Sequence, residues 1–228
     1  MKRSTVNDII RESDAFMRSF GFIMPPFAYL DPEALKARVN SDGAMIRDHM
    51  LGWDITDYGQ GDYENLGLFL FTVRNGNAAN VARGMGPLYA EKLLISEENQ
   101  ISPMHHHIKK TEDIINRGGA TLVLELWTRA EDGTLDPAAP VEVMTDGQMR
   151  VLQPGEHLAL APGESVTLEP WHWHAFWGEG GKVLIGEVSN VNDDRTDNIF
   201  RDPIGRFSSI DEDEAPLHLL VSDYDSWL

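Results

Sequence analysis

The spacing of apolar residues divides the chain into a helical start and a β-rich remainder. In the first 21 residues, apolar side chains recur at three- and four-residue intervals, which predicts an amphipathic helix closed by Gly21. These apolar residues are Val6, Ile9, Ile10, Met17 and Phe20. Two prolines then break the chain, and Asp31 before Pro32 predicts the N-cap of a second helix. That helix runs toward Met50, with residues 40–43 as a candidate interruption.

From about Trp53 the pattern changes to short extended runs. They are residues 66–74, 90–96, 121–127, 157–160, 165–168, 172–177 and 182–188. Asn75-Gly76 is typical of a two-residue hairpin turn. Further turn signals are Asp132-Gly133, Asp146-Gly147, Pro154-Gly155, Pro162-Gly163 and the glycine-rich residues 178–181. Many short strands separated by turns predict an antiparallel barrel or sandwich.

The domain organisation predicted from these runs is simple. There is no repeat of fixed period and no linker long enough to divide the chain. We therefore expect one domain over residues 1–228, in which a helical extension (1–52) packs on a barrel with a C-terminal tail (53–228). The apolar stretch at residues 217–221 is expected to pack on the same chain or on a second subunit.

Charge and composition narrow the classes of partner and chemistry. The chain has 37 acidic and 19 basic residues, a net charge of −18, which disfavours nucleic acid and anionic membranes as partners. There are no cysteines, so any metal ion must be held by nitrogen and oxygen ligands. The charged N-terminal residues lack an apolar signal core, and we expect a cytoplasmic protein.

The densest chemical signal is Met-His-His-His-Ile-Lys-Lys-Thr-Glu at residues 104–112. On a strand, His105 and His107 point to one face and His106 to the other. A tight turn near residues 108–109 would place Glu112 on a neighbouring antiparallel strand, beside the two histidines. Lys110 would share the face of Glu112, whereas Lys109 would point outward.

A second histidine cluster lies at residues 170–177, Pro-Trp-His-Trp-His-Ala-Phe-Trp. His172 and His174 share a face, so alternation alone does not choose between them as a further ligand. Three histidines and one carboxylate leave open positions on an octahedral cation, as in a catalytic site. The tryptophans of this cluster suit either core packing or stacking against a sugar ring.

The two clusters together resemble the cupin superfamily. The match is His-x-His, four residues, Glu, six residues and Gly, followed later by a proline-containing turn and a histidine. Within that superfamily, residues 91–119, 51–57 and 187–198 are similar to the D-lyxose isomerase family, and the likeness covers most of the chain.

The resemblance implies a mainly β fold, a cupin-type antiparallel β-barrel (jelly roll) with an α-helical N-terminal extension. It also implies interconversion of D-lyxose with D-xylulose and of D-mannose with D-fructose. The expected cofactor is Mn²⁺, with another divalent cation as an alternative, and the expected assembly is a homodimer with a monosaccharide as its partner.

The resemblance further assigns the metal ligands His105, His107, Glu112 and, in Trp-His-Ala-Phe-Trp, His174. One departure is Pro170-Trp171-His172 where a Pro-Gly-like turn is expected, and it keeps His172 open as a competitor of His174.

The catalytic candidates follow from the chemistry of aldose–ketose interconversion, which needs a base for a carbon-bound proton and an acid for an oxygen. Glu187, which shares a strand face with apolar residues, is the candidate base, because a carboxylate among apolar neighbours binds a proton more tightly. Glu112 is a ligand that can also shuttle a proton, and Lys110 is a candidate proton donor. Sugar contacts are expected from three residues: Trp173, Asp193 and Arg195.

Three alternatives stay open at this stage. The same ligand set suits an iron-dependent cupin oxygenase, and a cupin that binds a sugar without turning it over would also carry such a site. For an isomerase, a hydride shift would need no base at carbon.

Overall fold

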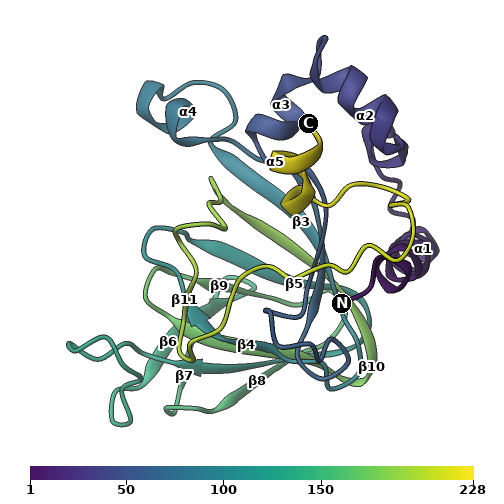
Figure 1. Cartoon of the computed structure of the whole chain (residues 1–228). Coiled ribbons are helices and arrows are strands. Elements are labelled where there is room, and N and C mark those ends of the chain that lie inside the picture. Colours follow the sequence, from purple (N-terminus) through teal and green to yellow (C-terminus); the bar gives the residue numbers. More distant parts are fainter.

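The computed structural model describes all 228 residues, and its helical start matches the predicted pattern. Helix α1 (Arg3–Ser19) ends just before Gly21, whose φ of 81° suits a glycine after a helix. After the short 3₁₀ helix η1 (Pro26–Tyr29), the Asp31 side chain accepts a hydrogen bond from the Ala34 amide at 2.8 Å and begins α2 (Pro32–Val39). The predicted interruption is real, since a separate helix α3 (Ala44–Asp48) follows. These helices lie along one side of the β-rich body (Figure 1).

The remainder of the chain is mainly antiparallel β-sheet, as predicted. Eleven strands form one sheet in which β1, β2, β3, β10, β5, β9, β6 and β7 are successive neighbours. Off this path, β4 pairs with β10 and β11, and β8 pairs with β5. The strands are β1 (Gly52–Thr56), β2 (Leu68–Arg74), β3 (Tyr89–Ser96), β4 (Ser102–His106), β5 (Glu112–Trp127), β6 (Val141–Thr145), β7 (Gln148–Leu152), β8 (His157–Leu160), β9 (Ser165–Leu168), β10 (Trp173–Asn190) and β11 (Ile199–Phe200).

The two long strands β5 and β10 pair with each other along most of their length. The first part of β10 also pairs with β4, and its second part pairs with β3. The prediction of a turn at residues 178–181 was wrong, because these glycines lie within β10. They form an irregularity where the β10–β5 register shifts between Glu179 and Val183. One continuous strand therefore carries both His174 and Glu187.

The predicted hairpin at Asn75-Gly76 was also wrong. Strands β2 and β3 do pair, but residues 75–88 between them hold the helix α4 (Ala78–Arg83). The Asn75 side chain is buried and exchanges two hydrogen bonds, both 3.0 Å, with the backbone of Asn192. This long-range contact replaces the local turn that the sequence suggests.

Two apolar layers hold the sheet and the helices together. Inside the sheet, 18 buried residues form one cluster, and 13 others join α1 to the outer face of the sheet through residues such as Ile10, Phe69 and Leu184. The C-terminal tail packs on its own chain, since Leu219, Val221 and Tyr224 contact α2 and α3 residues. The chain also ends in two short helices, η2 (Val221–Asp223) and α5 (Tyr224–Trp227).

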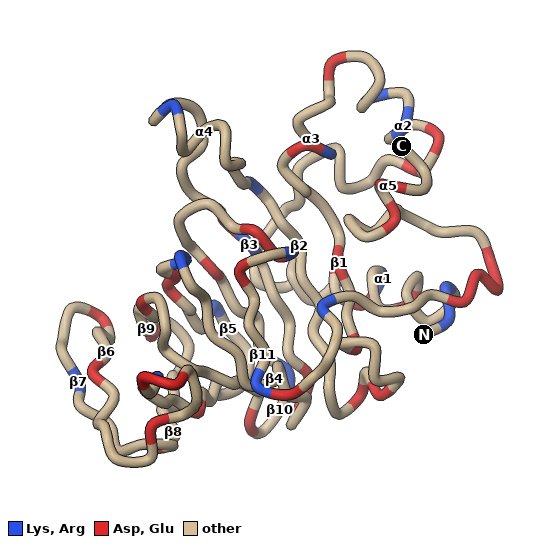
Figure 2. The backbone as a smooth tube through the Cα atoms, turned by 60° about the vertical axis from the view of Figure 1, so that its left-hand side comes forward, with Lys and Arg blue, Asp and Glu red and all other residues tan.

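Charged side chains are spread over the molecule. Figure 2 shows Asp and Glu positions on helices, strands and loops in every part of the chain. Arg3 is fully enclosed and contacts Asp223 at 2.9 Å, a buried pair that ties α1 to the C-terminal segment. None of the helices has the length and apolar character needed to cross a membrane.

Candidate active site

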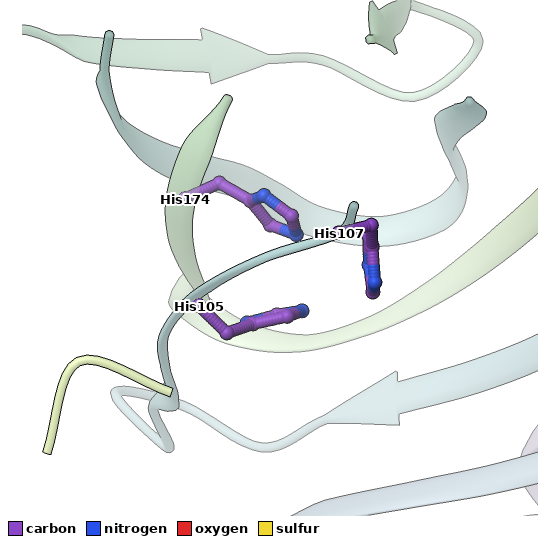
Figure 3. A group of neighbouring side chains, drawn as sticks. All are labelled: His105, His107 and His174. Carbon is purple, nitrogen blue, oxygen red and sulfur yellow. The ribbon is translucent and has the colours of Figure 1, made fainter. Parts of the chain in front are cut away.

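Three histidine rings converge at the junction of β4 and β10 (Figure 3). Their candidate ligand nitrogens, on His105, His107 and His174, all lie within 4.8 Å of one another. In each ring Nδ1 is hydrogen-bonded to a backbone carbonyl: Pro103 at 2.8 Å, Asp197 at 2.7 Å and His172 at 3.0 Å, respectively. A carbonyl oxygen only accepts, so Nδ1 carries the proton and Nε2 keeps its lone pair. All three rings therefore direct Nε2 toward a common centre.

Glu112 completes this arrangement. It is 2% exposed, and its Oε1 lies 3.2 Å from His107 Nε2 and 3.3 Å from His174 Nε2. His107 Nε2 and Glu112 Oε1 are buried and have no hydrogen-bond donor between them. Two buried acceptors facing each other are unfavourable unless a proton or a cation lies between them. The nitrogen and oxygen donor set therefore fits a divalent metal ion.

The route by which Glu112 reaches the histidines differs from the predicted one. Strands β4 and β5 do not pair, because β10 lies between them and pairs with both. Residues 107–111 leave β4 and lead across to the start of β5, where Glu112 pairs with Ser189. The chain bends at residues 108–109 as expected, but this bend does not close a hairpin.

Lys110 lies between two buried carboxylates. Its Nζ is 2.6 Å from Glu112 Oε2 and 3.1 Å from Glu187 Oε1, and the residue is 3% exposed. Lys109 is exposed, as alternation predicts. Burial alone lowers the pKa of Lys110, but attraction to Glu112 and Glu187 outweighs it and raises the pKa. Burial likewise raises the pKa of Glu112, but attraction to Lys110 outweighs this effect and holds that pKa well below its ordinary value.

Glu187 faces the same cavity from β10. It is buried, and its Oε1 lies 3.1 Å from Lys110 Nζ and 3.7 Å from Lys92 Nζ. The sequence suggested apolar neighbours for this carboxylate, but the structure also places two lysines beside it. Two ammonium groups lie beside it, and they compensate the cost of burying an ionised carboxylate.

The cavity also contains a second group of charges, Lys92, Asp194 and Arg206, of which sequence reasoning missed Lys92 and Arg206. Asp194 lies 3.3 Å from Lys92 and 3.4 Å from Arg206, whose other contact is Asp54 at 2.7 Å. Burial raises the pKa of Asp194, but the two cations outweigh that effect and lower it well below its usual range. These residues come from distant parts of the chain. Of the two that were missed, only Lys92, a lysine next to the apolar run Leu-Leu-Ile, carried a sequence signal.

None of the three predicted sugar contacts lines this cavity. Trp173 points to the opposite face of β10 from His174, and its ring packs edge-on against His106 at 4.3 Å. Asp193 is exposed and accepts hydrogen bonds within its own loop, and Arg195 pairs with Asp225 at 2.8 Å. Asp194, between these two residues, is the one that turns inward.

His172 lies outside the histidine group. Its Nδ1 accepts a hydrogen bond from the Glu169 amide at 3.1 Å. The preceding Trp171 has a φ of 75°, so a tryptophan takes the left-handed conformation expected of a glycine at this turn. Its amide donates to the His107 carbonyl at 2.8 Å, which fixes the turn beside the site. The geometry thus favours His174 over His172 as the fourth ligand.

Alanine variants of the two histidines are therefore expected to differ sharply. His174→Ala should weaken Mn²⁺ binding on the order of 100-fold or more. Removing a residue that only supports a metal ligand typically weakens binding by about 10- to 100-fold. His172→Ala should bind Mn²⁺ as the unmodified protein does. Calorimetric titration of both metal-free variants checks this, and a larger loss in His172→Ala would reverse the assignment.

Asp194→Asn is expected to lower the free energy of unfolding at pH 7 by about 3 kcal/mol, because it leaves Lys92 and Arg206 buried without this counter-charge. The folded-state pKa of Asp194 lies below its ordinary value of 3.8, so its contribution is present above that pH. The contribution is lost as the pH falls through the folded-state pKa. Urea unfolding at pH 7 and pH 3 should show the variant approaching the parent at the lower pH.

Asp202→Asn is the matched control, since Asp202 is exposed and pairs with Arg201 at the surface. It should change stability by less than about 1 kcal/mol at either pH. Equal effects of the two substitutions would contradict a role for Asp194 as the buried counter-charge.

Comparison with known proteins agrees with this site. The family model described as D-lyxose isomerase matches residues 1–224. The chain is 44% identical over 227 residues to the D-lyxose/D-mannose isomerase of Serratia proteamaculans and 41% identical over 228 residues to that of Escherichia coli O157:H7. Each match covers 98% of both chains. The chain belongs to the D-lyxose isomerase family. It is therefore a sugar isomerase.

Solved structures show how widely this family's fold is shared. The L-ribose isomerase of Acinetobacter sp. DL28, in complex with L-ribose, superposes with a TM-score of 0.62 at 15% identity. The L-ribose isomerase of Geodermatophilus obscurus gives a TM-score of 0.61 at 18% identity. Both matches cover 92% of this chain and 98% of the other. At such low identity they show a common fold.

Proposed function

We propose that this sugar isomerase interconverts D-lyxose with D-xylulose and D-mannose with D-fructose, using one divalent cation, Mn²⁺, held by His105, His107, Glu112 and His174. The observation that carries the proposal is the buried pair of acceptors, His107 Nε2 and Glu112 Oε1, beside Lys110. The names of the two relatives support the choice of sugars. When bound, the cation supplies Lewis-acid polarisation of the sugar oxygens at C1 and C2.

The remaining polar residues of the cavity are suited to bind the sugar. Lys92, Asp194 and Arg206 offer charged donors and acceptors to hydroxyl groups. The Nη1 of Arg206 is buried and has no hydrogen-bond partner. A hydroxyl oxygen of the sugar would accept a hydrogen bond from this nitrogen. Binding would then remove the cost of leaving a buried donor unpaired.

Glu187 is the proposed base. Its carboxylate takes the proton from C2 of the aldose and returns it to C1, so that one carboxylate serves both carbons from one face of the sugar. Lys110 lies 3.1 Å from Glu187 and is protonated, so it donates a proton to O1 as the cis-enediol forms. It recovers a proton from O2 when the ketone forms. The two steps move two hydrogens and leave Glu187 and Lys110 in their starting states.

Three broader features belong to the same proposal. The bent sheet closes as a cupin-type barrel around the site, and residues 1–228 act as one domain. The active species is a homodimer. Support for the homodimer comes from the apolar side chains exposed in and beside α4, namely Val81, Met85, Leu88 and Tyr89.

The experiment that tests this function combines product analysis with isotope exchange. Purified protein with Mn²⁺ should convert D-lyxose and D-mannose anaerobically to their ketoses and should release hydrogen label from C2 into water. Full retention of the label would point to a hydride shift. Oxygen consumption without isomerisation would identify an oxygenase, and sugar binding without any ketose would identify a binding protein.

A further inference from the structure

Asp197 makes an unusual set of contacts with the segment that carries His107 and Lys110. Its Oδ1 accepts hydrogen bonds from the amides of Ile108 and Lys109 at 3.0 and 3.1 Å. Its Oδ2 accepts from the amide of Lys110 at 3.0 Å. One buried carboxylate thus holds three consecutive backbone N–H groups that belong to no strand.

The backbone of the same residue holds the His107 ring. His107 Nδ1 donates to the Asp197 carbonyl at 2.7 Å, the shortest of the three histidine–carbonyl contacts in the site. This bond sets which ring nitrogen carries the proton and leaves Nε2 toward Glu112. Asp197 therefore contacts both the ring of one proposed ligand and the backbone of the proposed proton donor.

The loop around Asp197 is itself braced. The Asp197 amide donates to the Asp193 carbonyl at 3.0 Å, and the Asp193 side chain accepts from the amides of Arg195 and Thr196. Within this turn Asp194 enters the cavity and contacts Lys92. The loop thus places Asp194 in the cavity and Asp197 against residues 107–110, which include the proposed metal ligand His107.

We propose that Asp197 is the positioning residue of this site, which sets the Nε2-exposed form of His107 and the direction of Lys110 before substrate or metal arrives. The three N–H donors are bound by both oxygens of the side chain. A carboxylate accepts at both oxygens, whereas an amide has one oxygen and one NH₂ group. In Asp197→Asn, an NH₂ group would face one of those donors. This inference rests on the proposed function, in which His107 binds the metal ion and Lys110 donates a proton.

The first test uses the unmodified, metal-free protein. Long-range ¹H–¹⁵N NMR should show His107 with its proton on Nδ1, and hydrogen exchange at the amides of residues 108–110 should be slow. A proton on Nε2, or rapid exchange at these three amides, would overturn the proposal without any variant. Neither measurement depends on activity or on whether the protein binds Mn²⁺.

The second test compares Asp197→Asn with Asp136→Asn. Asp136 also accepts from two backbone amides, those of Ala138 and Ala139 at 2.8 and 3.0 Å, but in a loop far along the chain from the site. Asp197→Asn should weaken Mn²⁺ binding by about 10- to 100-fold and speed exchange at residues 108–110. Asp136→Asn should change neither quantity.

The outcomes separate the two proposals. Mn²⁺ affinity and exchange in Asp197→Asn equal to those of the unmodified protein would overturn the role of Asp197. Failure of the unmodified protein to bind Mn²⁺ would contradict the proposed function instead. In that case the NMR and exchange results still decide whether Asp197 positions His107 and Lys110.

Discussion

Glu112→Gln is expected to remove both Mn²⁺ binding and isomerase activity, with kcat/KM falling on the order of a thousandfold or more. The substitution removes the negative charge that faces His107, His174 and Lys110. It also offers an NH₂ group toward nitrogen lone pairs that need a cation. Metal analysis of the purified variant and a D-lyxose assay measure the two losses separately.

Glu142→Gln is the control, since Glu142 lies exposed on β6 and contacts nothing in the site. It should keep both metal and activity. A Glu112→Gln protein that binds Mn²⁺ normally and turns over D-lyxose would remove Glu112 from the metal centre.

Glu187→Gln is expected to separate catalysis from metal binding. The variant should bind Mn²⁺ with affinity close to that of the parent, because Glu187 contacts Lys110 and Lys92 rather than the histidines. Its kcat should fall by about 10²- to 10⁴-fold, the usual contribution of a general base. Exchange of the C2 hydrogen with water should be lost along with turnover.

Glu179→Gln on the same strand is the matched control, because Glu179 is exposed and lies outside the cavity. It should leave kcat unchanged. If Glu187→Gln still exchanges the C2 hydrogen at the parental rate, another group is the base, and Glu112 becomes the first candidate.

Local patterns predicted most of the elements. The helix caps at Asp31 and Gly21 and the short strands β8 and β9 depend on near neighbours in sequence, and the structure confirms them. The failures occurred where distant contacts override a local preference. Asn75 pairs with Asn192, and the glycines at residues 178–181 continue a strand because β5 pairs with β10 on both sides of them.

Alternation along a strand predicted which histidine rings lie together, but it could not predict how separate strands meet. Alternation separated His105 and His107 from His106, and applied to β10 it also places Trp173 away from His174, a step that the sequence-based choice of sugar contacts ignored. The charges at Lys92 and Arg206 escaped prediction because they meet only after strands far apart in sequence assemble.

We propose that one divalent cation, held by three histidines and Glu112, is required for this chain to work as an isomerase. Titrating Mn²⁺ into chelator-treated protein while following conversion of D-lyxose to D-xylulose tests it most directly. Without metal we expect no turnover, and at one Mn²⁺ per chain we expect full activity. His174→Ala should show no activity at any point of the titration. Undiminished turnover in the metal-free protein would contradict it.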